Sequence, residues 1–213
     1  MIELAGDTVV CFGLTTEERG ERRNVALCVS GDGILGRHDK VHLPPAERFA
    51  YTPGSGFAAF DTPVGRIGML VCYDKLFPEA ARALALDGAE TICSLAAWPE
   101  DRRRPAANPL HDRQVRHFDA IDVARAIENQ VTVVSSNMTG PWGELAYLGS
   151  AKIVDPDGQV LARTDGIGAG TALAVVDPAA DRAEMTLDVD HLADRRPDAY
   201  GVTARTLGRA ATG

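Results

Sequence analysis

The chain has 213 residues and a net charge of −8, from 22 lysine and arginine residues against 30 aspartate and glutamate residues. With 45% hydrophobic and 24% charged residues, the composition is that of a globular protein and excludes a wholly disordered chain. The acidic balance argues against nucleic acid or an anionic membrane as a partner, and no apolar run approaches the roughly 18 residues of a membrane helix.

The cysteines provide no sign of a metal site or a disulfide framework. Cys11, Cys28, Cys72 and Cys93 form no CxxC pair and have no histidine at zinc-ligand spacing. The first residues also lack the basic and apolar regions of a secretory signal. We therefore expect reduced thiols, a cytoplasmic location, and neither a metal nor an organic cofactor.

Short β-like runs alternate with two helical segments along the chain. Several runs are joined by hairpin signals at Gly31–Gly33, Pro63–Gly65 and Pro156–Gly158. The predicted strands are Thr8–Phe12, Asn24–Val29, Ile34–Asp39, Phe57–Phe60, Arg66–Cys72, Thr91–Leu95, Val131–Ser135, Ala151–Val154, Gln159–Ala162 and Thr171–Val176. Hairpins mixed with strand–helix–strand units predict a layered α/β fold with a mixed sheet.

The two predicted helices are Pro78–Asp87 and Asp112–Asn129. The first has a proline at its start and Gly88 just past its end. The second places Ala120, Val123, Ala124 and Ile127 on one face at helical spacing, which predicts that this face is buried. Helices are scarce before residue 78, so one face of the sheet has little to cover it, and we expect the chain to begin inside a domain.

Cys72 is the strongest candidate for chemistry. An apolar strand runs directly into it, and the helix at Pro78 follows. Ligands bind at this end of a strand in open α/β sheets, and a nearby helix N-terminus favours a thiolate and lowers the pKa of a thiol. The alternative for Cys72 is a buried core cysteine, which is the expected role of Cys11, Cys28 and Cys93.

Lys40 and Glu47 are further candidates. Lys40 follows the strand Ile34–Asp39 and is flanked by apolar residues and prolines, so it could supply a fixed positive charge to an oxyanion or a thiol. Glu47 could orient that lysine or act as a base. The alternatives are a surface lysine and a solvated loop charge. A Cys–His dyad with His42 is possible, but a surface or structural role is favoured for each histidine.

Together these residues resemble the motifs of the nitrilase superfamily of carbon–nitrogen hydrolases, in order, from about residue 7 to residue 200. Lys40–Leu43 with Glu47 and Thr52–Gly54 resembles the lysine motif, and Gly68–Glu79 resembles the nucleophile motif. Further matching segments are Ala97–Pro99, Arg125–Asn129, Asn137, Gly149–Ser150, Val154–Gly158, Arg195–Pro197 and Tyr200.

The resemblance implies an α-β-β-α sandwich, an amidase-like hydrolase and a Glu–Lys–Cys triad. By position in these motifs, Cys72 would be the nucleophile, Lys40 the lysine and Glu47 an auxiliary glutamate. The sequence Cys72-Tyr73-Asp74 is more similar to the amidase branches than to the nitrile-cleaving ones. The Tyr73 backbone N–H would help to hold the oxyanion, and Trp98 and Asn137 would line the substrate pocket. A small-molecule amide would be the substrate, its carbonyl forming a thioester with the cysteine, and a homodimer or higher homo-oligomer would be the assembly.

One departure concerns the general base. In the family, the base glutamate follows the first strand and helix in a Phe-Pro-Glu context, and the sequence has no such stretch before Lys40. We therefore expect a single domain over 1–213 that lacks its first strand–helix layer, with a loosely packed tail after about residue 200 and low turnover by this chain alone. Three interpretations stay open: an amidase whose sequence continues upstream, a catalytically impaired relative that acts as a binding protein, and a split enzyme.

Overall fold

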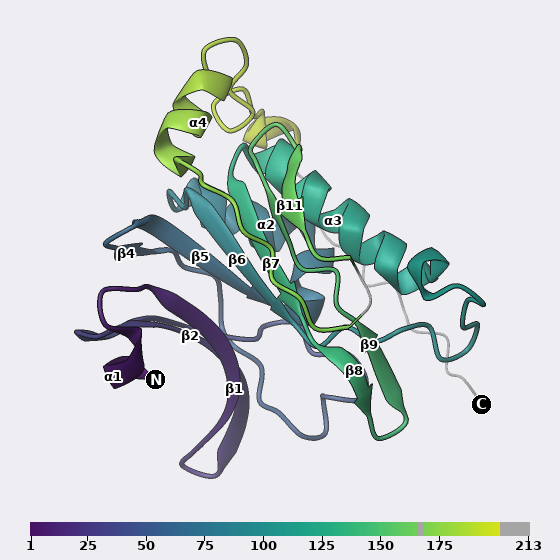
Figure 1. The fold of residues 1–213 in the computed structure, drawn as a ribbon. Coiled ribbons are helices and arrows are strands. Elements are labelled where there is room, and N and C mark those ends of the chain that lie inside the picture. Colours follow the sequence, from purple (N-terminus) through teal and green to yellow (C-terminus); the bar gives the residue numbers. More distant parts are fainter. Residues whose placement is uncertain (166–167, 201–213) are drawn as a thin grey trace.

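Two β-sheets lie face to face, and the two long helices cover the outer face of the larger sheet (Figure 1). The structure is a computed structural model that describes residues 1–165 and 168–200. Among the described helices, none combines the length and the apolar character that crossing a membrane requires. The α/β fold predicted from the sequence is confirmed.

The smaller sheet is an antiparallel meander of three strands in the order β1-β2-β3. The strands are β1 (Val10–Glu18), β2 (Glu21–Ser30) and β3 (Gly33–Asp39). The predicted Gly31–Gly33 turn joins β2 to β3, and Gly33 has a φ of 135° that favours glycine. Strand β1 extends beyond the predicted end at Phe12. The sequence did not indicate this second half, because it belongs to an edge strand and its residues are mostly exposed and polar. Helix α1 (Ile2–Ala5) packs against β2.

The larger sheet has six strands in the order β11-β10-β7-β6-β5-β4. Its strands are β4 (Phe60–Thr62), β5 (Gly65–Val71), β6 (Thr91–Ala96), β7 (Thr132–Asn137), β10 (Lys152–Val154) and β11 (Val160–Arg163). The three central strands β5, β6 and β7 are parallel, and β4, β10 and β11 pair antiparallel at the two sides. Consequently the carboxyl ends of β5, β6 and β7 meet at one edge of the sheet.

The long helices α2 (Pro78–Leu86) and α3 (Arg113–Asn129) begin and end within one residue of the predicted bounds. Pro78 occupies the first turn of α2, and the Asp112 side chain caps α3 by accepting from the Gln114 backbone N–H. The remaining elements are short: η1 (Cys72–Leu76), η2 (Pro109–His111), α4 (Pro178–Met185), η3 (Pro197–Ala199) and the hairpin β8 (Thr139–Trp142) with β9 (Leu145–Leu148).

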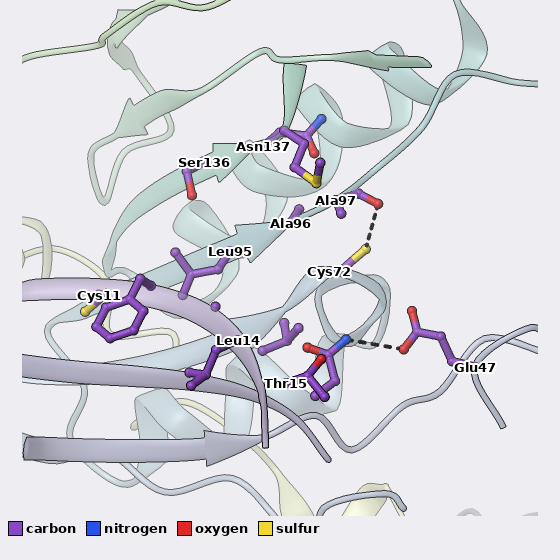
Figure 2. A pocket seen from close by; sticks show the side chains of 15 residues that line it. Cys11, Leu14, Thr15, Glu47, Cys72, Leu95, Ala96, Ala97, Ser136 and Asn137 are labelled. Atoms are coloured by element: carbon purple, nitrogen blue, oxygen red, sulfur yellow. Dashed lines mark hydrogen bonds between the residues drawn. The ribbon is translucent and has the colours of Figure 1, made fainter. Parts of the chain in front are cut away.

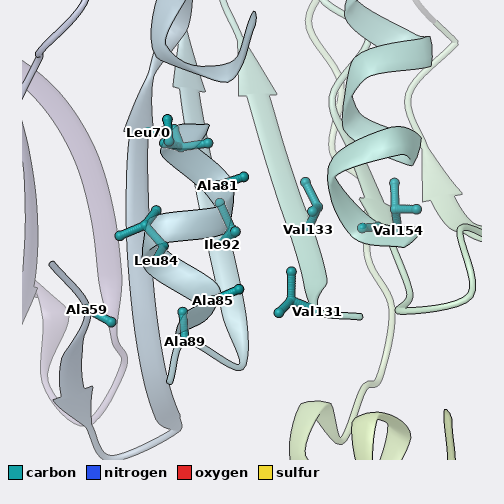
Figure 3. Close-up of a cluster of buried hydrophobic side chains, with 12 residues drawn as sticks. Ala59, Leu70, Ala81, Leu84, Ala85, Ala89, Ile92, Val131, Val133 and Val154 are labelled. Carbon is teal, nitrogen blue, oxygen red and sulfur yellow. The ribbon is translucent and has the colours of Figure 1, made fainter. Parts of the chain in front are cut away.

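Successive side chains of the central strands point to opposite faces of the six-stranded sheet, and this produces two separate hydrophobic cores. On β5, Leu70 points toward the helices, whereas Met69 and Val71 point toward the three-stranded sheet. The helix-side core includes Leu84 of α2 and Ile92 of β6 (Figure 3). The core between the sheets consists of Ala26, Cys28, Ile67, Met69, Val71 and Cys93.

The predicted buried face of α3 is largely wrong: of its four residues, Val123 packs half-buried against the helix-side core. Ala120 and Ala124 are exposed, and Ile127 is 40% exposed. The face that packs against the protein carries Val115, Phe118, Asp122, Arg125, Ala126 and Asn129. The pattern failed because two of these inward positions hold charged side chains, which a search for apolar periodicity assigns to solvent.

The C-terminal part also differs from prediction. Residues 171–176 form no strand, although inward and outward residues alternate, and Leu173 and Val175 are 85% and 100% exposed. An extended segment without a neighbouring strand cannot complete the ladder that the sequence pattern suggests. The hairpin β8–β9 and helix α4 were not predicted. The tail after Tyr200, expected to be loosely packed, lies outside the described residues.

Candidate active site

A cavity of about 570 Å³ lies at the carboxyl ends of β5, β6 and β7, with β1 of the other sheet lining its opposite side (Figure 2). Open α/β sheets bind ligands at this end of their parallel strands. The lining residues are Cys11, Phe12, Gly13, Leu14, Thr15, Asn24, Glu47, Val71, Cys72, Leu95, Ala96, Ala97, Ser136, Asn137 and Met138.

Cys72 is the first residue after β5 and begins the turn η1. Its φ of 50° is left-handed, a conformation that is uncommon for a residue with a side chain and clusters at functional sites. The thiol lies in the cavity, with Sγ 3.8 Å from the carbonyl oxygen of Ala97 (Figure 2). Burial raises the pKa of the Cys72 thiol, and the Lys40 ammonium opposes this only in part. The prediction of a lowered thiol pKa at this turn is therefore wrong, because desolvation outweighs the favourable charge.

Lys40 and Glu47 form a close ion pair beside the cavity. Lys40 is 1% exposed, and its Nζ lies 2.7 Å from both carboxylate oxygens of Glu47, which lines the cavity. The Gly54 backbone N–H donates to the Lys40 carbonyl at 2.8 Å. A Cβ at Gly54 would overlap the Asp39 carbonyl oxygen, so this close approach requires glycine. The alternatives of a surface lysine and a free loop carboxylate are therefore wrong.

Asp74 connects the lysine segment to the turn of Cys72. It is fully buried and accepts from the Val71 backbone N–H at 3.2 Å and the His42 backbone N–H at 2.8 Å. Its carboxylate also lies 3.0 Å from His38 Nε2 and 3.0 Å from His42 Nδ1. Burial raises the pKa of Asp74, but these hydrogen bonds outweigh burial and hold the pKa below its ordinary value.

The two histidines have structural roles. His38 is 5% exposed, and the His42 ring stacks on Phe77 with centroids 3.7 Å apart and on Phe57 at 5.8 Å. The structural role favoured for His42 over a Cys–His dyad agrees with its bond to Asp74. Sequence reasoning missed Asp74, although its position two residues after Cys72 was a usable signal.

The three predicted substrate contacts have different surroundings. Asn137 lines the cavity, and its side chain bonds the Trp98 backbone N–H at 2.7 Å and carbonyl at 3.1 Å. The Trp98 ring is buried against Phe118 and donates to Gln114 Oε1 at 2.9 Å, so it packs away from the cavity. The Tyr73 ring contacts Phe77 edge-on and lines a different cavity, next to His42 and Tyr51. The pocket-lining role expected of Trp98 is therefore wrong, and the role expected of Tyr73 concerns its backbone N–H and not this ring.

Strand β1 contributes lining residues that the sequence did not indicate. Leu14 and Thr15 face Cys72 across the cavity, and Ser136 and Asn137 lie at the end of β7 (Figure 2). Leu14, Thr15 and Ser136 could not be predicted as lining residues, because no motif surrounds them and their position depends on how the two sheets pack. Within residues 1–165 and 168–200, no group of three histidine, cysteine, aspartate or glutamate side chains is arranged to hold a metal ion.

The four thiols differ in their surroundings, and we expect Cys72 to react first with limiting iodoacetamide. Cys28 and Cys93 are buried between the sheets. For Cys11, the contact with Cys28 lowers the pKa, but Cys93 and burial raise it to about 12. Peptide mapping by mass spectrometry measures the order of labelling. Faster labelling of Cys11, Cys28 or Cys93 would contradict the assignment of Cys72 as the reactive thiol.

The model of one protein family, carbon–nitrogen hydrolase, matches residues 5–183 of this chain. The chain belongs to the carbon–nitrogen hydrolase family. It is 32% identical over 195 residues to a probable nitrilase of Schizosaccharomyces pombe, a match that covers 90% of this chain and 67% of the relative. The resemblance seen in the sequence motifs is thereby confirmed.

Solved structures agree with this membership. The crystal structure of a carbon–nitrogen hydrolase from Helicobacter pylori G27 superposes with a TM-score of 0.83 at 29% identity, over 91% of this hydrolase and 70% of that chain. A mutant amidase from Nesterenkonia sp. AN1, with acrylamide added at its active-site cysteine, superposes with a TM-score of 0.73 at 25% identity, over 91% and 68%. This hydrolase therefore spans about two thirds of the length of each of these relatives.

Family membership makes the protein an amidase-like enzyme that hydrolyses non-peptide carbon–nitrogen bonds. These relatives favour the enzyme over the alternative of a binding protein without hydrolase chemistry.

Proposed function

We propose that the enzyme hydrolyses a small-molecule amide to an acid and ammonia or an amine through a thioester on Cys72. The observation that carries the proposal is the position of the Cys72 thiol in the cavity that Glu47 also lines, with the buried Lys40 ammonium paired to Glu47. A cysteine adduct in the related Nesterenkonia amidase supports the same chemistry.

In the proposed reaction, the Cys72 thiolate attacks the amide carbonyl carbon. The C–N bond then breaks, and the nitrogen leaves as ammonia or an amine with the proton that the thiol gave up. Water then attacks the thioester carbonyl, which releases the acid and returns a proton to the Cys72 sulfur. The Lys40 ammonium stabilises the negative oxygen of the tetrahedral intermediate, together with the backbone N–H of Tyr73. Glu47 holds Lys40 in place: both its carboxylate oxygens are engaged by Nζ at 2.7 Å, so we do not assign it the whole role of general base.

The cavity favours a neutral substrate. Its lining is mostly apolar, and Glu47, which is paired with Lys40, is the charged side chain in it. Asn137 and Ser136 are placed to accept or donate hydrogen bonds to the substrate. A cytoplasmic location and assembly into a homodimer or higher oligomer are further proposals. The exposed apolar side chains of Leu173, Val175 and Leu187 support the second.

The proposal is tested by trapping the first half of the reaction. We expect incubation with a simple aliphatic amide, followed by acid quench, to trap one acyl group on the peptide that contains Cys72, with release of one ammonia per acyl group in the first turnover. Cys11→Ala, which removes the other thiol in the cavity, is the control and should leave the adduct unchanged. An adduct elsewhere, or ammonia release without a Cys72 adduct, would contradict the thioester route.

A further inference from the structure

A cluster of buried charges lies on the helix side of the active-site strands. Lys75, Asp122 and Lys152 are each 1% exposed. Lys75 Nζ lies 2.7 Å from one carboxylate oxygen of Asp122, and Lys152 Nζ lies 2.9 Å from the other. Lys152 Nζ also lies 3.0 Å from Asp119 Oδ1. Burying two ammonium groups costs several kcal/mol per ion before pairing, so this arrangement is not explained by packing alone.

The cluster fills the space between α3 and the six-stranded sheet. Lys75 Nζ lies 3.0 Å from the centroid of the Phe118 ring and 3.5 Å from Ser135 Oγ on β7. Lys152 Nζ lies 4.3 Å from the same ring centroid. The two lysines thus share one aromatic ring and one carboxylate, and both Phe118 and Asp122 belong to the inward face of α3.

Lys75 belongs to the turn that begins with Cys72. Both residues lie in η1. Arg125 of α3 bonds the same turn twice more, because it donates to the Lys75 carbonyl at 2.9 Å and to the Leu76 carbonyl at 3.1 Å. The charged residues of α3 therefore hold the turn on which Cys72 adopts its left-handed backbone. The polar residues Asp122 and Arg125 on the inward face of α3 thus bond the turn that carries Cys72.

We propose that Lys75 is a positioning residue for the nucleophile: its buried ammonium, held by Asp122 behind the turn of Cys72, favours the thiolate. This inference rests on the proposed function of Cys72. Lys40 follows β3 of the three-stranded sheet, whereas the Lys75 ammonium lies on the helix side, paired with Asp122 of α3. The two lysines therefore place positive charge near the thiol from opposite sides, and both lower its pKa.

The groups that face Lys75 set the pH range of this effect. The pKa of Lys75 is lowered to about 8: burial is the largest cause and Lys152 acts in the same direction, whereas Asp122 and Cys72 oppose the shift. Asp119 contacts Lys152 and is not a direct partner of Lys75. Below about pH 8 the ammonium is charged and stabilises the thiolate, and above that pH this support is lost.

The test uses the double variant Lys75→Met/Asp122→Leu, which removes both members of the pair and leaves no buried charge without a partner. Lys152 keeps Asp119 at 3.0 Å in this variant. The matched control is Lys152→Met, which removes the other buried lysine but leaves Asp122 with Lys75 and Asp119 with Ser150 at 2.6 Å. The measurement is the rate of Cys72 carboxymethylation by iodoacetamide as a function of pH, read by peptide mass spectrometry.

We expect labelling of Cys72 at pH 7 to be about tenfold slower in the double variant, because Lys75 is charged there in the parent, and the difference to disappear well above pH 8, where Lys75 is neutral. Lys152→Met should stay within about twofold of the parent. Parent-like labelling in the double variant, or an equal shift in Lys152→Met, would overturn the inference. Because labelling requires no turnover, the outcome is separate from the proposed function: the thioester can form on Cys72 whether or not Lys75 affects the thiol.

Discussion

Replacing Lys40 by methionine is expected to slow acylation of Cys72 by a hundred- to a thousandfold. Loss of one oxyanion donor typically has an effect of this size. The Lys40 ammonium also opposes the effect of burial on the Cys72 pKa, so its removal lowers the thiolate fraction as well. Quenched-flow measurement of the acyl adduct gives the rate, and the pH dependence of iodoacetamide labelling gives the change in the thiol.

Lys40→Arg is the matched variant for this measurement. It keeps the charge, but a planar guanidinium cannot replace a compact ammonium that lies 2.7 Å from both Glu47 oxygens, so we expect no rescue of the rate. Lys40→Met should still fold, because the Glu47 side chain is 26% exposed and can be hydrated when its partner is lost. An acylation rate within threefold of the parent would remove Lys40 from the mechanism.

Asp74→Ala is expected to lower the free energy of unfolding by about 3–5 kcal/mol, measured by urea denaturation at pH 7. The substitution leaves the backbone N–H groups of Val71 and His42 and the buried ring of His38 without their acceptor. The control is Asp61→Ala at the sheet edge, where the side chain is 87% exposed and pairs with Arg66. That variant should differ from the parent by less than about 1 kcal/mol.

The effect of Asp74 should depend on pH in a defined direction. Its pKa is lower in the folded protein than the ordinary value of 3.8, so the native state binds fewer protons than the unfolded state near that pH. The stabilisation is present above pH 3.8 and is lost as pH falls through the folded pKa. A difference between the parent and Asp74→Ala that stayed constant from pH 7 to pH 3 would show that the carboxylate charge contributes nothing.

The nucleophile turn could be predicted from sequence because several local signals agree there. An apolar run ends at Cys72, a proline begins the next helix, and strand β5 and helix α2 form close to the expected bounds. Local consistency of this kind is what makes a segment predictable. The order of the motifs then identified the family, which its model confirmed over residues 5–183.

The supporting residues could not be predicted, because their partners are distant in sequence. Asp74 meets His38 across 36 residues, and Lys75 meets Asp122 across 47. Charged residues at these positions are assigned to solvent by any pattern of polarity, and only the packing of α3 on the turn shows them to be buried. For the same reason Trp98, which follows a strand of the site, was expected in the pocket but packs on Phe118.

The nucleophile and the lysine come from different sheets, so the separation of the sheets sets the distance over which they act. Cys72 follows β5, and Lys40 follows β3. Small side chains between the sheets, such as Ala26 and Cys28, allow a close approach, and Gly36 leaves room for the Phe60 ring. A bulkier residue there would act as a wedge and move the ammonium away from the thiol without touching either. The side chains packed between the two sheets thus set the distance between the ammonium and the thiol. Substitutions there are limited by the need to keep this distance as well as by the stability of the core.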